Sequence, residues 1–583
     1  MNMEVVQMIM TLLGGLALFI FGMNMMSDGL QKSAGDKMRS ILAMLTKNPI
    51  LGVVAGALCT AVLQSSSATT VMVIGFVSAG LMKLPQAISI ILGANIGTTI
   101  TAQLIAFKIG DYAWAFVVVG FILYFFIKRK EIVTYIGQTI FAFGVLFVGI
   151  NIMSDTMKPL ANSPVFIDLM LQVQNVPVLG VLLGTIMTVV VQSSSATIAV
   201  LQNLAATAGP DGVSSIIGLE GALPILFGDN IGTTITAVLA SIGASVAAKR
   251  TAAAHVIFNI TGTLIFIWFI PYYAQFIEFI SPKGAEVDVI ARQIANAHLC
   301  FNLFNTILFI PLIGVLVIVV SKIVPGKELD RLPSEPIYLD YNVLERPFAA
   351  IHLATKELSR LAQMTLGMVI SAQKAFIGND AQEVKKVMDA EDTVNTLQEK
   401  IVNYLAAMFT KETTTEEQAA KISGLMHIAS DIEHIGDHCK NIAEFADEKM
   451  KNSYEFSDEA YSEIYGCFDL AKRMTGDSIM ALEEGDANLA TNIRSLEAEM
   501  NLKEKELRKH HMVRLNQKKC SPEFTVIYTD VIHNIEKIGD YCNNIAEAII
   551  DDTGGTASGP VMRPAGSESP EDPPTDPPAG SGN

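Results

Sequence analysis

The sequence predicts an all-α protein in two parts, a polytopic membrane bundle followed by a soluble helical domain. Half of the 583 residues are hydrophobic, but apolar segments of the ~20 residues needed to cross a bilayer occur only before about residue 325. Up to Pro325 the chain has 15 basic and 13 acidic residues, and after it 26 and 45. A nearly neutral, apolar half followed by an acidic half indicates a membrane domain joined to a soluble domain. The acidity argues against nucleic acid as a partner.

Changes in composition divide the chain into four segments. They are a membrane domain (1–323), a linker (324–345), a helical domain (346–552) and a tail (553–583). The tail is rich in Gly, Pro, Ser and acidic residues, so we expect disorder there. The six cysteines form no CxxC pair, which favours reduced thiols over a disulfide framework. The first residues lack the basic flank of a secretory signal, so we expect the first apolar run to be retained.

Nine apolar stretches lie in the membrane domain, and two of them are unusual. The stretches 49–80 and 177–208 are long for one crossing and are split by polar residues at their centres. We interpret both as re-entrant hairpins, because broken backbone at membrane depth survives only where protein or water satisfies it. The alternative is a bundle of nine ordinary helices. The seven predicted crossings lie near residues 8–30, 86–107, 111–127, 132–154, 215–242, 250–278 and 293–323.

The basic residues between the spans predict an orientation. With the N-terminus outside and each hairpin counted as no crossing, eleven basic residues fall inside and four outside, as the positive-inside rule requires. Seven crossings then place the acidic domain in the cytoplasm, and we expect a multi-pass protein of the inner (cytoplasmic) membrane. The inside residues are Lys32, Lys37, Arg39, Lys47, Lys83, Lys128, Arg129, Lys130, Lys249, Arg250 and Lys322, and the outside residues are Lys108, Lys158, Lys283 and Arg292.

The membrane domain contains two copies of one unit, at about 8–127 and 132–278. The first copy reads ALFIFGMNMMSDGL, then QSSSATT, then LGANIGTTIT, and the second reads GVLFVGINIMSDTM, then QSSSATI, then FGDNIGTTIT. Three crossings separate the starts of the copies, and an odd number reverses orientation. Inverted repeats are typical of secondary transporters, whose binding site lies near the midplane where the repeats meet.

The repeated motifs supply the candidate binding residues. All but one are neutral hydroxyls or amides, and buried groups of this kind without partners cost roughly 1–3 kcal/mol each. A lone SSS is usually helix-packing glue, but two copies at equivalent places favour a ligand. The candidates are Gln64, Ser65, Ser66, Ser67, Thr69, Asn95, Thr98 and Thr99 in the first copy, and Gln192, Ser193, Ser194, Ser195, Thr197, Asp229, Asn230, Thr233 and Thr234 in the second.

These groups suit two kinds of ligand. Oxygens bind a hard alkali cation, whereas hydroxyls, amide N–H groups and helix N-termini bind an oxyanion. Because no Lys or Arg lies at the span centres, an anion would need positive charge from helix ends or from a co-bound ion, which favours coupling an anion to Na⁺. The glycines of GANIGTT and GDNIGTT are expected to let the helix unwind there.

Asp229 breaks the symmetry between the copies, because Ala94 is its counterpart. An ionisable residue at membrane depth is a functional candidate. Asp229 is interpreted as a Na⁺ ligand, a proton carrier or a cap on a broken helix. We expect His255 and Glu220, near the starts of two spans, to be interfacial.

On these residues the sequence resembles the type II sodium–phosphate cotransporter family, which is marked by paired QSSS hairpins in inverted repeats. The resemblance covers about residues 8–323. It implies a Na⁺-driven phosphate symporter, with the motif residues lining the phosphate and sodium sites. It is less specific for the cargo and the direction of transport.

The soluble half has its own internal repeat. Helical periodicity predicts helices at 346–377, 380–410, 415–450, 457–484, 486–519 and 521–551. DIEHIGDHCKNIAE at 431–444 is echoed by NIEKIGDYCNNIAE at 534–547, so we expect two three-helix bundles. In each copy an acid pair at i and i+4 shares one helix face. Such a pair is commonly just a solvated acidic face.

This segment resembles PhoU-like phosphate-regulatory domains, whose ExxxD pairs bind metal clusters. The resemblance implies a divalent or iron-type metal. The candidate ligands are Glu433, Asp437, Glu536 and Asp540, joined by Glu391 or Asp392 and supported by Asn441 and Asn544. His434 and His438 occur only in the first copy, so they are not among the expected ligands.

Three functions compete at this point. The first is Na⁺-coupled phosphate symport by alternating access with a regulatory or sensing cytoplasmic domain, and the cargo could also be another oxyanion. The second is a membrane-anchored phosphate sensor without transport. The third is a passive ion channel, which the paired hairpins disfavour. No P-loop, CxxC or Ser–His–Asp constellation points to an enzyme. Expected partners are phosphate, Na⁺, membrane lipid and either a second copy of the chain (a homodimer) or a cytoplasmic regulatory protein.

Overall fold

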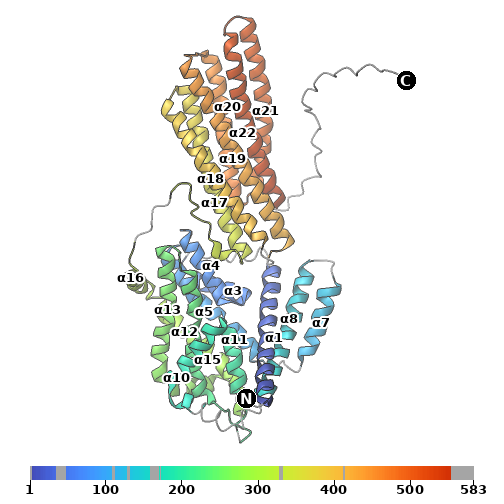
Figure 1. Ribbon diagram of the computed structural model, residues 1–583, viewed down its shortest axis with the longest axis vertical. Coiled ribbons are helices and arrows are strands. Elements are labelled where there is room, and N and C mark those ends of the chain that lie inside the picture. Colours follow the sequence, from blue (N-terminus) through green and yellow to red (C-terminus); the bar gives the residue numbers. More distant parts are fainter. Residues whose placement is uncertain are drawn as a thin grey trace, which may run out of the picture.

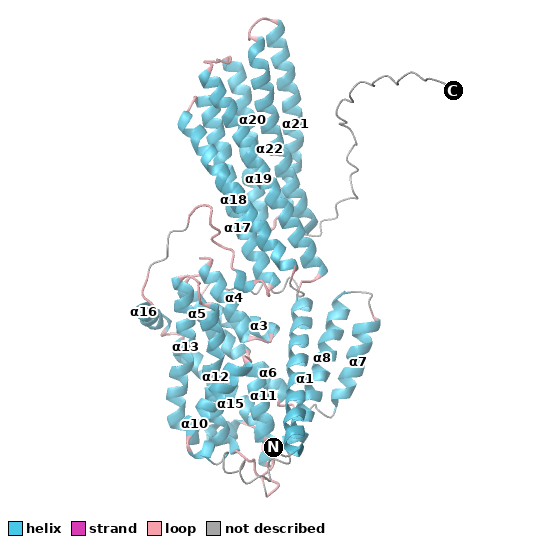
Figure 2. Cartoon of the chain, viewed as in Figure 1, coloured by secondary structure: helices cyan, strands magenta, loops and turns pink. Residues whose placement is uncertain are grey.

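The protein is helical in both halves (Figures 1 and 2). The computed structural model describes residues 3–34, 48–107, 112–127, 131–157, 170, 172–209, 211–326, 332–410 and 414–552. No strand occurs among these residues, and Ala208 and Ser215 form an isolated bridge. The predicted disordered tail lies outside the described residues. The all-α class is therefore confirmed.

The membrane half consists of a row of helices, α1, α8 and α7, beside a compact group of helices (Figure 1). Helix α1 packs along α8, and α7 packs on the far side of α8. The helices of this half are α1 (Met3–Ala34), α3 (Pro49–Leu63), α4 (Ser66–Ser78), α5 (Leu84–Gly97), α6 (Thr99–Ile105), α7 (Ala113–Phe126), α8 (Glu131–Met157), α10 (Pro177–Val191), α11 (Ser194–Ala205), α12 (Gly218–Ala240), α13 (Val246–Phe266), α14 (Ile270–Ile280), α15 (Glu286–Phe309) and α16 (Ile313–Ile323), with η4 (Ile267–Phe269) joining α13 to α14.

The two predicted hairpins are present. Each contains two apolar helices of 12–15 residues, shorter than the ~20 residues of a span, separated by a two-residue turn. The nine-helix alternative is therefore wrong. The first residue of each turn, Gln64 or Gln192, has a left-handed backbone with φ of 51° or 55°. The second, Ser65 or Ser193, caps the following helix by accepting a hydrogen bond from the backbone N–H three residues on.

Five of the described helical stretches are long and apolar enough to cross a membrane: Val6–Ser33, Leu84–Ile105, Glu131–Met157, Gly218–Ala240 and Val246–Ile280. The predicted span at 293–323 is wrong as a single rod, because α15 and α16 meet at an angle of 86°. Pro311 lies at the break, where its ring and missing N–H stop a helix. Helix α15 alone has 24 residues, about 36 Å, enough for one crossing.

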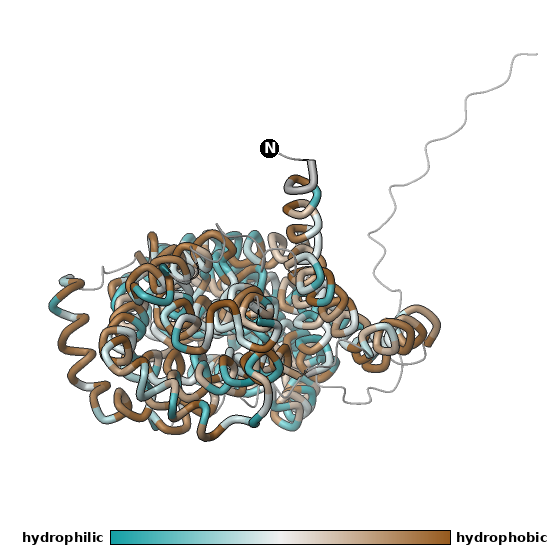
Figure 3. The backbone as a smooth tube through the Cα atoms, turned by 90° about the horizontal axis from the view of Figure 1, so that it is seen from below, coloured by the Kyte–Doolittle hydropathy of each residue, from teal (hydrophilic) through white to brown (hydrophobic). Residues whose placement is uncertain are grey.

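Hydrophobic residues lie along much of the backbone of this half in the view from below (Figure 3), and many of their large side chains are exposed. Helix α7 exposes Trp114, Phe121, Phe125 and Phe126. An exposed aromatic and aliphatic belt of this kind suits contact with lipid rather than water.

The glycines of GANIGTT and GDNIGTT allow neighbouring helices to pack closely. The unwinding predicted there is wrong for the second copy. Helix α12 continues unbroken through Gly228 and Gly232. A methyl group on Gly93 would overlap the carbonyl oxygen of Val53 in α3, and one on Gly228 would overlap that of Val181 in α10. Each outer hairpin helix therefore lies directly on the backbone of the span behind it.

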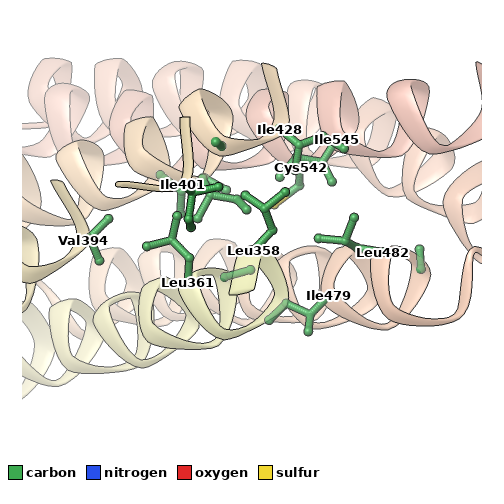
Figure 4. Packing of buried hydrophobic residues seen from close by; sticks show 14 of the residues in the cluster. Leu358, Leu361, Val394, Ile401, Ile428, Ile479, Leu482, Cys542 and Ile545 are labelled. Atoms are coloured by element: carbon green, nitrogen blue, oxygen red, sulfur yellow. The ribbon is translucent and has the colours of Figure 1, made fainter. Parts of the chain in front are cut away.

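The soluble half is the predicted pair of three-helix bundles. The first contains α17 (Pro347–Gly378), α18 (Ala381–Phe409) and α19 (Glu416–Lys451), and the second contains α20 (Asp458–Glu484), α21 (Ala487–Asn516) and α22 (Thr525–Asp552). The bundles join through α17 against α20 and α19 against α22. Figure 4 shows Leu358 and Leu361 of the first bundle in one core with Ile479, Leu482 and Ile545 of the second.

The soluble half rests on one end of the membrane half (Figure 1). The short helix η5 (Tyr341–Val343) lies against Gly75 of α4, where an added methyl group would be 2.9 Å from Val343 Cγ1. The rings of Phe76 and His352 meet edge to face with centroids 5.7 Å apart. One continuous hydrophobic core therefore runs from the first hairpin into the first bundle.

The described part of the linker is held firmly to the first bundle. The buried carboxylate of Glu357 accepts hydrogen bonds from the backbone N–H groups of Ile337 and Tyr338 at 2.8 and 2.6 Å. Arg360 bonds to the same carboxylate and donates to the carbonyl oxygen of Glu335. The segment that touches the hairpin is thus anchored by charge-assisted bonds.

Candidate functional site

The two hairpin turns bring two helix N-termini into the interior of the membrane half. Ser66 and Ser67 begin α4, and Ser194 and Ser195 begin α11. The first N–H groups of a helix have no intrahelical partner and carry partial positive charge. Each QSSS motif therefore presents hydroxyls and free backbone donors at the same point.

The hairpins open toward opposite ends of the membrane half, which confirms the inversion. The C-terminal end of α4 lies on η5 of the soluble half. The chain after α11 lies at the start of α15 instead, where the N–H of Ser215 donates to Glu286 at 2.9 Å. Helix α15 ends near the level of the soluble half and begins at the opposite end (Figure 1).

Hydroxyl groups of opposite repeats meet crosswise at the turns. Thr98 Oγ1 of the first NIGTT segment is 3.5 Å from Ser194 Oγ of the second QSSS motif. In the reverse sense, Thr236, two residues after the second NIGTT segment, donates to Ser67 Oγ of the first motif at 3.2 Å. The four motifs therefore form one polar centre built from both repeats.

A second pair of matching contacts lies inside each hairpin. Thr60 donates to Thr69 at 2.8 Å, and Thr188 is paired in the same way with Thr197 at 3.0 Å. The second copy extends this pair, because Thr188 lies 2.7 Å from Oδ1 of Asp229. Asp229 is fully buried, and its Oδ2 atom has no hydrogen-bond partner. The centre thus contains one carboxylate oxygen available to a ligand.

The remaining predicted residues belong to the same motifs. They differ in whether their polar side-chain atoms are available to a ligand or already hydrogen-bonded within their own helix. Asn95 and Asn230 donate their amide groups to carbonyls four residues earlier, which directs each carbonyl oxygen away from its own helix. The hydroxyls of Thr99, Thr233 and Thr234 bond to their own helices. These bonds leave the serines, with the free helix N–H groups, as the better ligands.

The two turns differ in exposure. Gln64 is buried, and its Oε1 accepts a hydrogen bond from Thr101 at 2.9 Å. Gln192 is exposed. The structure therefore shows an asymmetric arrangement of two nearly identical motifs, as expected when a site is more accessible from one hairpin than from the other.

The expectation that His255 is interfacial is wrong. His255 lies well inside α13, is 1% exposed, and its Nε2 is 3.5 Å from Oδ1 of Asn95. The span begins at Val246, earlier than the predicted residue 250, so His255 is in its third turn. Glu220 is exposed in the first turn of α12, in agreement with its prediction.

In the soluble half, one acid pair forms a metal-binding arrangement with a histidine. Glu433, His434 and Asp437 of α19 offer three ligand atoms within 4.8 Å of one another. Burial, followed by the negative charges of Asp437 and Glu391, raises the pKa of Glu433. His434 has no counterpart in the second copy, so the repeat does not predict it as a ligand. Its position between Glu433 and Asp437 is the feature of the sequence that indicates it.

The other acid pair is partly neutralised by a lysine of the protein. Lys537 occupies the position that His434 has in the first copy, and its ammonium lies 2.6 Å from Asp540 and 3.4 Å from Glu536. Burial alone would lower the pKa of Lys537, but these two carboxylates raise it. Lys440 similarly bonds to Glu391 at 3.1 Å. The two pairs are therefore not equivalent.

The predicted supporting asparagines join the two bundles. Asn441 of α19 donates to Asn534 of α22 at 3.1 Å, and Asn544 of α22 donates to Asp431 of α19 at 3.4 Å. This reciprocal exchange between equivalent positions fixes α19 against α22, beside the acid pairs.

Two inverted repeats with re-entrant hairpins, followed by a six-helix domain of internal two-fold symmetry, define a membrane protein of the inverted-repeat class with a PhoU-type domain. The model of the Na⁺/Pi-cotransporter family matches residues 18–155 and again 148–280, and that of the PhoU domain matches 358–446 and 465–549. The chain belongs to the Na⁺/Pi-cotransporter family.

Relatives with different names match different shares of the chain. The protein YqeW of Bacillus subtilis (strain 168) is 35% identical over 268 residues, 46% of this chain and 84% of its own. A protein of Escherichia coli (strain K12) named "Putative inorganic phosphate export protein YjbB" is 24% identical over 93% of this chain and 97% of its own. The human sodium-dependent phosphate transport protein 2B is 39% identical over 17% of this chain and 15% of its own.

Among solved structures, PhoU from Pseudomonas aeruginosa is similar over 35% of this chain and 96% of its own. The sequence identity is 20% and the TM-score is 0.33.

Proposed function

We propose that the protein carries out Na⁺-coupled symport of inorganic phosphate by alternating access, regulated by its PhoU-like domain on the cytoplasmic side. The observation that carries the proposal is the crosswise contact of Thr98 with Ser194 and of Thr236 with Ser67. It joins two oppositely oriented hairpins at one centre, which is the arrangement that alternating access requires. Family membership supports a phosphate transporter.

The chemistry of the centre supports coupling of an anion to a cation. No Lys or Arg lies among the motif residues, so a phosphate would be held by serine hydroxyls and by the N-termini of α4 and α11. The free oxygen of Asp229 and the hydroxyl oxygens suit Na⁺. The cation and the anion then stabilise each other in a site of low dielectric constant. The name of the human relative supports sodium dependence, whereas that of the E. coli relative points to export.

The test is uptake of labelled phosphate into proteoliposomes with and without an inward Na⁺ gradient. We expect uptake to require Na⁺. Ser66→Ala and Ser194→Ala should each raise the phosphate concentration for half-maximal uptake about tenfold or more, because a hydrogen bond to a charged group contributes about 1.5–3 kcal/mol. Ser89→Ala is the matched control, since Ser89 is equally buried but bonds only within α5.

Each competing function predicts a different result. Phosphate binding without flux would identify a membrane-anchored sensor. Flux that does not saturate and follows voltage alone would identify a channel. Stronger competition by sulfate than by unlabelled phosphate would assign a different oxyanion. Preloading the liposomes with phosphate and reversing the Na⁺ gradient measures export in the same preparation.

The contact between η5 and the first hairpin predicts how the soluble domain acts. Val343→Asp places a charge against Gly75, and we expect α4 to loosen. Backbone hydrogen exchange over 66–78 should become several times faster, while 194–205 should not change, because α11 lies at the other end. Val526→Asp, at a 63% exposed position, is the control. An equal effect on both hairpins would contradict this coupling.

The acid pairs predict one metal ion per chain rather than two. Glu433→Gln and Asp437→Asn should remove the metal measured by elemental analysis of the purified protein, whereas Glu536→Gln should not, because the Lys537 ammonium already lies between the two carboxylates of that pair. A carboxylate must be deprotonated to bind a metal, and the pKa of Glu433 is raised. Binding should therefore weaken as the pH falls, starting above the range of an ordinary glutamate. Two metal ions per chain would contradict the prediction.

A further inference from the structure

The two bundles of the soluble half repeat each other residue by residue. Helices α18 and α21 begin after equivalent N-cap residues, Asp380 and Asp486, and each cap directly follows a residue with a left-handed backbone. Equivalent residues of α17 and α20, and of α18 and α21, therefore differ by 106 in number, the interval between these two caps. On this alignment Glu463 of α20 corresponds to Glu357 of α17. A difference between the bundles can thus be located at single positions.

In the first bundle, this position holds the chain's own linker. The carboxylate of Glu357 accepts hydrogen bonds from the backbone N–H groups of Ile337 and Tyr338. Tyr404 of α18 donates to the backbone carbonyl oxygen of Asp340 at 3.0 Å. The linker therefore lies across α17 and α18, and its backbone supplies hydrogen-bond partners to both side chains.

In the second bundle, the equivalent carboxylate binds side chains of its own bundle. Glu463 accepts hydrogen bonds from Arg514 at 2.7 Å and from Tyr528 at 2.6 Å, and its other oxygen lies 2.9 Å from Nδ1 of His510. On the same alignment, Arg514 corresponds to Met408 of the first bundle. Side chains thus take the place of the linker backbone, and a basic residue stands where the first bundle has an apolar one.

Arg514 lines a cavity of about 360 Å³ at this place. The cavity lies between the start of α20, the end of α21 and the turn before α22, at the end of the soluble half that is farther from the membrane half (Figure 1). The rings of Phe456 and Phe524 line it, with centroids 5.7 Å apart. Its volume is in the range of binding sites for small molecules.

Positive charge is concentrated at this cavity. Arg514, Lys518 and Lys519 line it, against a single acid, Glu455. The hydrogen bonds of Arg514 within the bundle use only Nη2, so its Nε and Nη1 atoms have no partner among the described residues. The stretch 507–522 contains five basic residues and no acidic residue, in a half of the chain that is acidic overall. Such a lining favours a negatively charged ligand rich in hydrogen-bond acceptors.

Lys518 occupies a backbone position where glycine is usual. Its φ angle is 54°, in the left-handed region. The N–H of Lys519 donates to the carbonyl of Arg514, and the N–H of Lys518 donates to that of Leu515, both at 2.9 Å, which is the Schellman motif that commonly ends a helix with glycine. Strained backbone of this kind clusters at ligand-binding positions. Lysine is therefore present at this wall of the cavity despite a conformational cost.

We propose that this cavity binds a small organic phosphate of the nucleotide class. Arg514, Lys518 and Lys519 hold its phosphoryl group, because guanidinium and ammonium groups donate charge-assisted hydrogen bonds to phosphate oxygens. The ring of the ligand packs against Phe456 and Phe524, whereas inorganic phosphate alone would leave these rings uncovered. Because the cavity lies at the end farther from the membrane half, the ligand is a free solute rather than a lipid headgroup. The site itself does not depend on transport, and only an effect of the ligand on uptake rests on the proposed function.

The test is binding of AMP to the purified full chain, measured by isothermal titration calorimetry in the presence of EDTA. We expect one AMP per chain. Lys518→Gly and Lys519→Gln should each raise the Kd for AMP several-fold, and the double variant about tenfold or more, because charge-assisted hydrogen bonds to the phosphoryl group are lost. Glycine accepts the left-handed backbone without strain, so the melting temperature of Lys518→Gly should not fall. Lys509→Gln is the matched control, because Lys509 is exposed on the same helix and lies outside the cavity lining.

The outcomes distinguish this cavity from the hairpin centre. Ser66→Ala should bind AMP as the parent protein does. Adenosine and inorganic phosphate should displace AMP only at about tenfold higher concentration or more than unlabelled AMP requires, because each lacks one half of the ligand. Unchanged AMP affinity in the double lysine variant, or equal displacement by inorganic phosphate, would overturn the proposal. AMP binding by a protein that shows no Na⁺-driven phosphate uptake would support the site and refute the proposed function.

Discussion

Replacing Asp229 by alanine is expected to reduce Na⁺-driven phosphate uptake about a hundredfold. The side chain is fully buried, one oxygen accepts from Thr188, and the other has no partner within the protein. A lone carboxylate at membrane depth is retained only where it binds or moves charge. Losing a charged ligand of about 3 kcal/mol corresponds to that factor. Alanine also reproduces the first repeat, where Ala94 is the counterpart.

Asp229→Asn removes the negative charge of this side chain and keeps its shape. The amide keeps the contact with Thr188 but carries no charge, so the number of charges moved per phosphate should change by one, measured as current in a supported membrane. Asp288→Asn, in the first turn of α15, should leave both the uptake and the current unchanged. Normal Na⁺-driven uptake by correctly folded Asp229→Ala would show that the carboxylate only stabilises the packing of α12 on α10.

Gly93→Ala and Gly228→Ala are expected to have the largest effects on stability. In each case the new methyl group would overlap a backbone carbonyl, of Val53 or of Val181, and a backbone carbonyl cannot turn aside as a side chain can. Overpacking a tight contact typically costs about 1–3 kcal/mol, and more where nothing relaxes. We expect a large fall in melting temperature and in the yield of monodisperse protein.

Gly14→Ala is the control for this pair. Gly14 lies in α1 with nothing within 4 Å of an added methyl group, and alanine is the better helix former. Its melting temperature should not fall. If Gly93→Ala were as stable as the parent protein, the outer hairpin helix α3 would be free to separate from α5, and the static packing described above would be wrong.

Much of the membrane fold follows from the sequence because its repeats are explicit. The duplicated QSSS and NIGTT segments predicted the hairpins and their inversion, and the turns fall at Gln64 and Gln192 as the polar residues indicated. The helix limits of the soluble half agree with prediction to within a few residues, since amphipathic periodicity is regular there. The bend at Pro311 was missed although the proline was visible.

What the sequence did not reveal depends on neighbours in space. Gly93 and Gly228 look like helix breakers until the carbonyls opposite them are known. His255 looks interfacial until the span start at Val246 and the contact with Asn95 are seen. In the sequence Lys537 looks like a lysine exposed to solvent, but its ammonium pairs with both Glu536 and Asp540.

Within the described residues, the first of the two pseudo-symmetric hairpins touches the soluble domain and the second does not, and this has a thermodynamic consequence. Two conformations related by exchange of the repeats would otherwise be close in free energy, and the one-sided contact makes them unequal. Anything that binds the soluble domain more tightly in one conformation shifts that balance by the ratio of its two affinities. Linkage is reciprocal, so a ligand that favours one of these conformations in the membrane half would change the affinity of the soluble domain for its own ligands by the same factor.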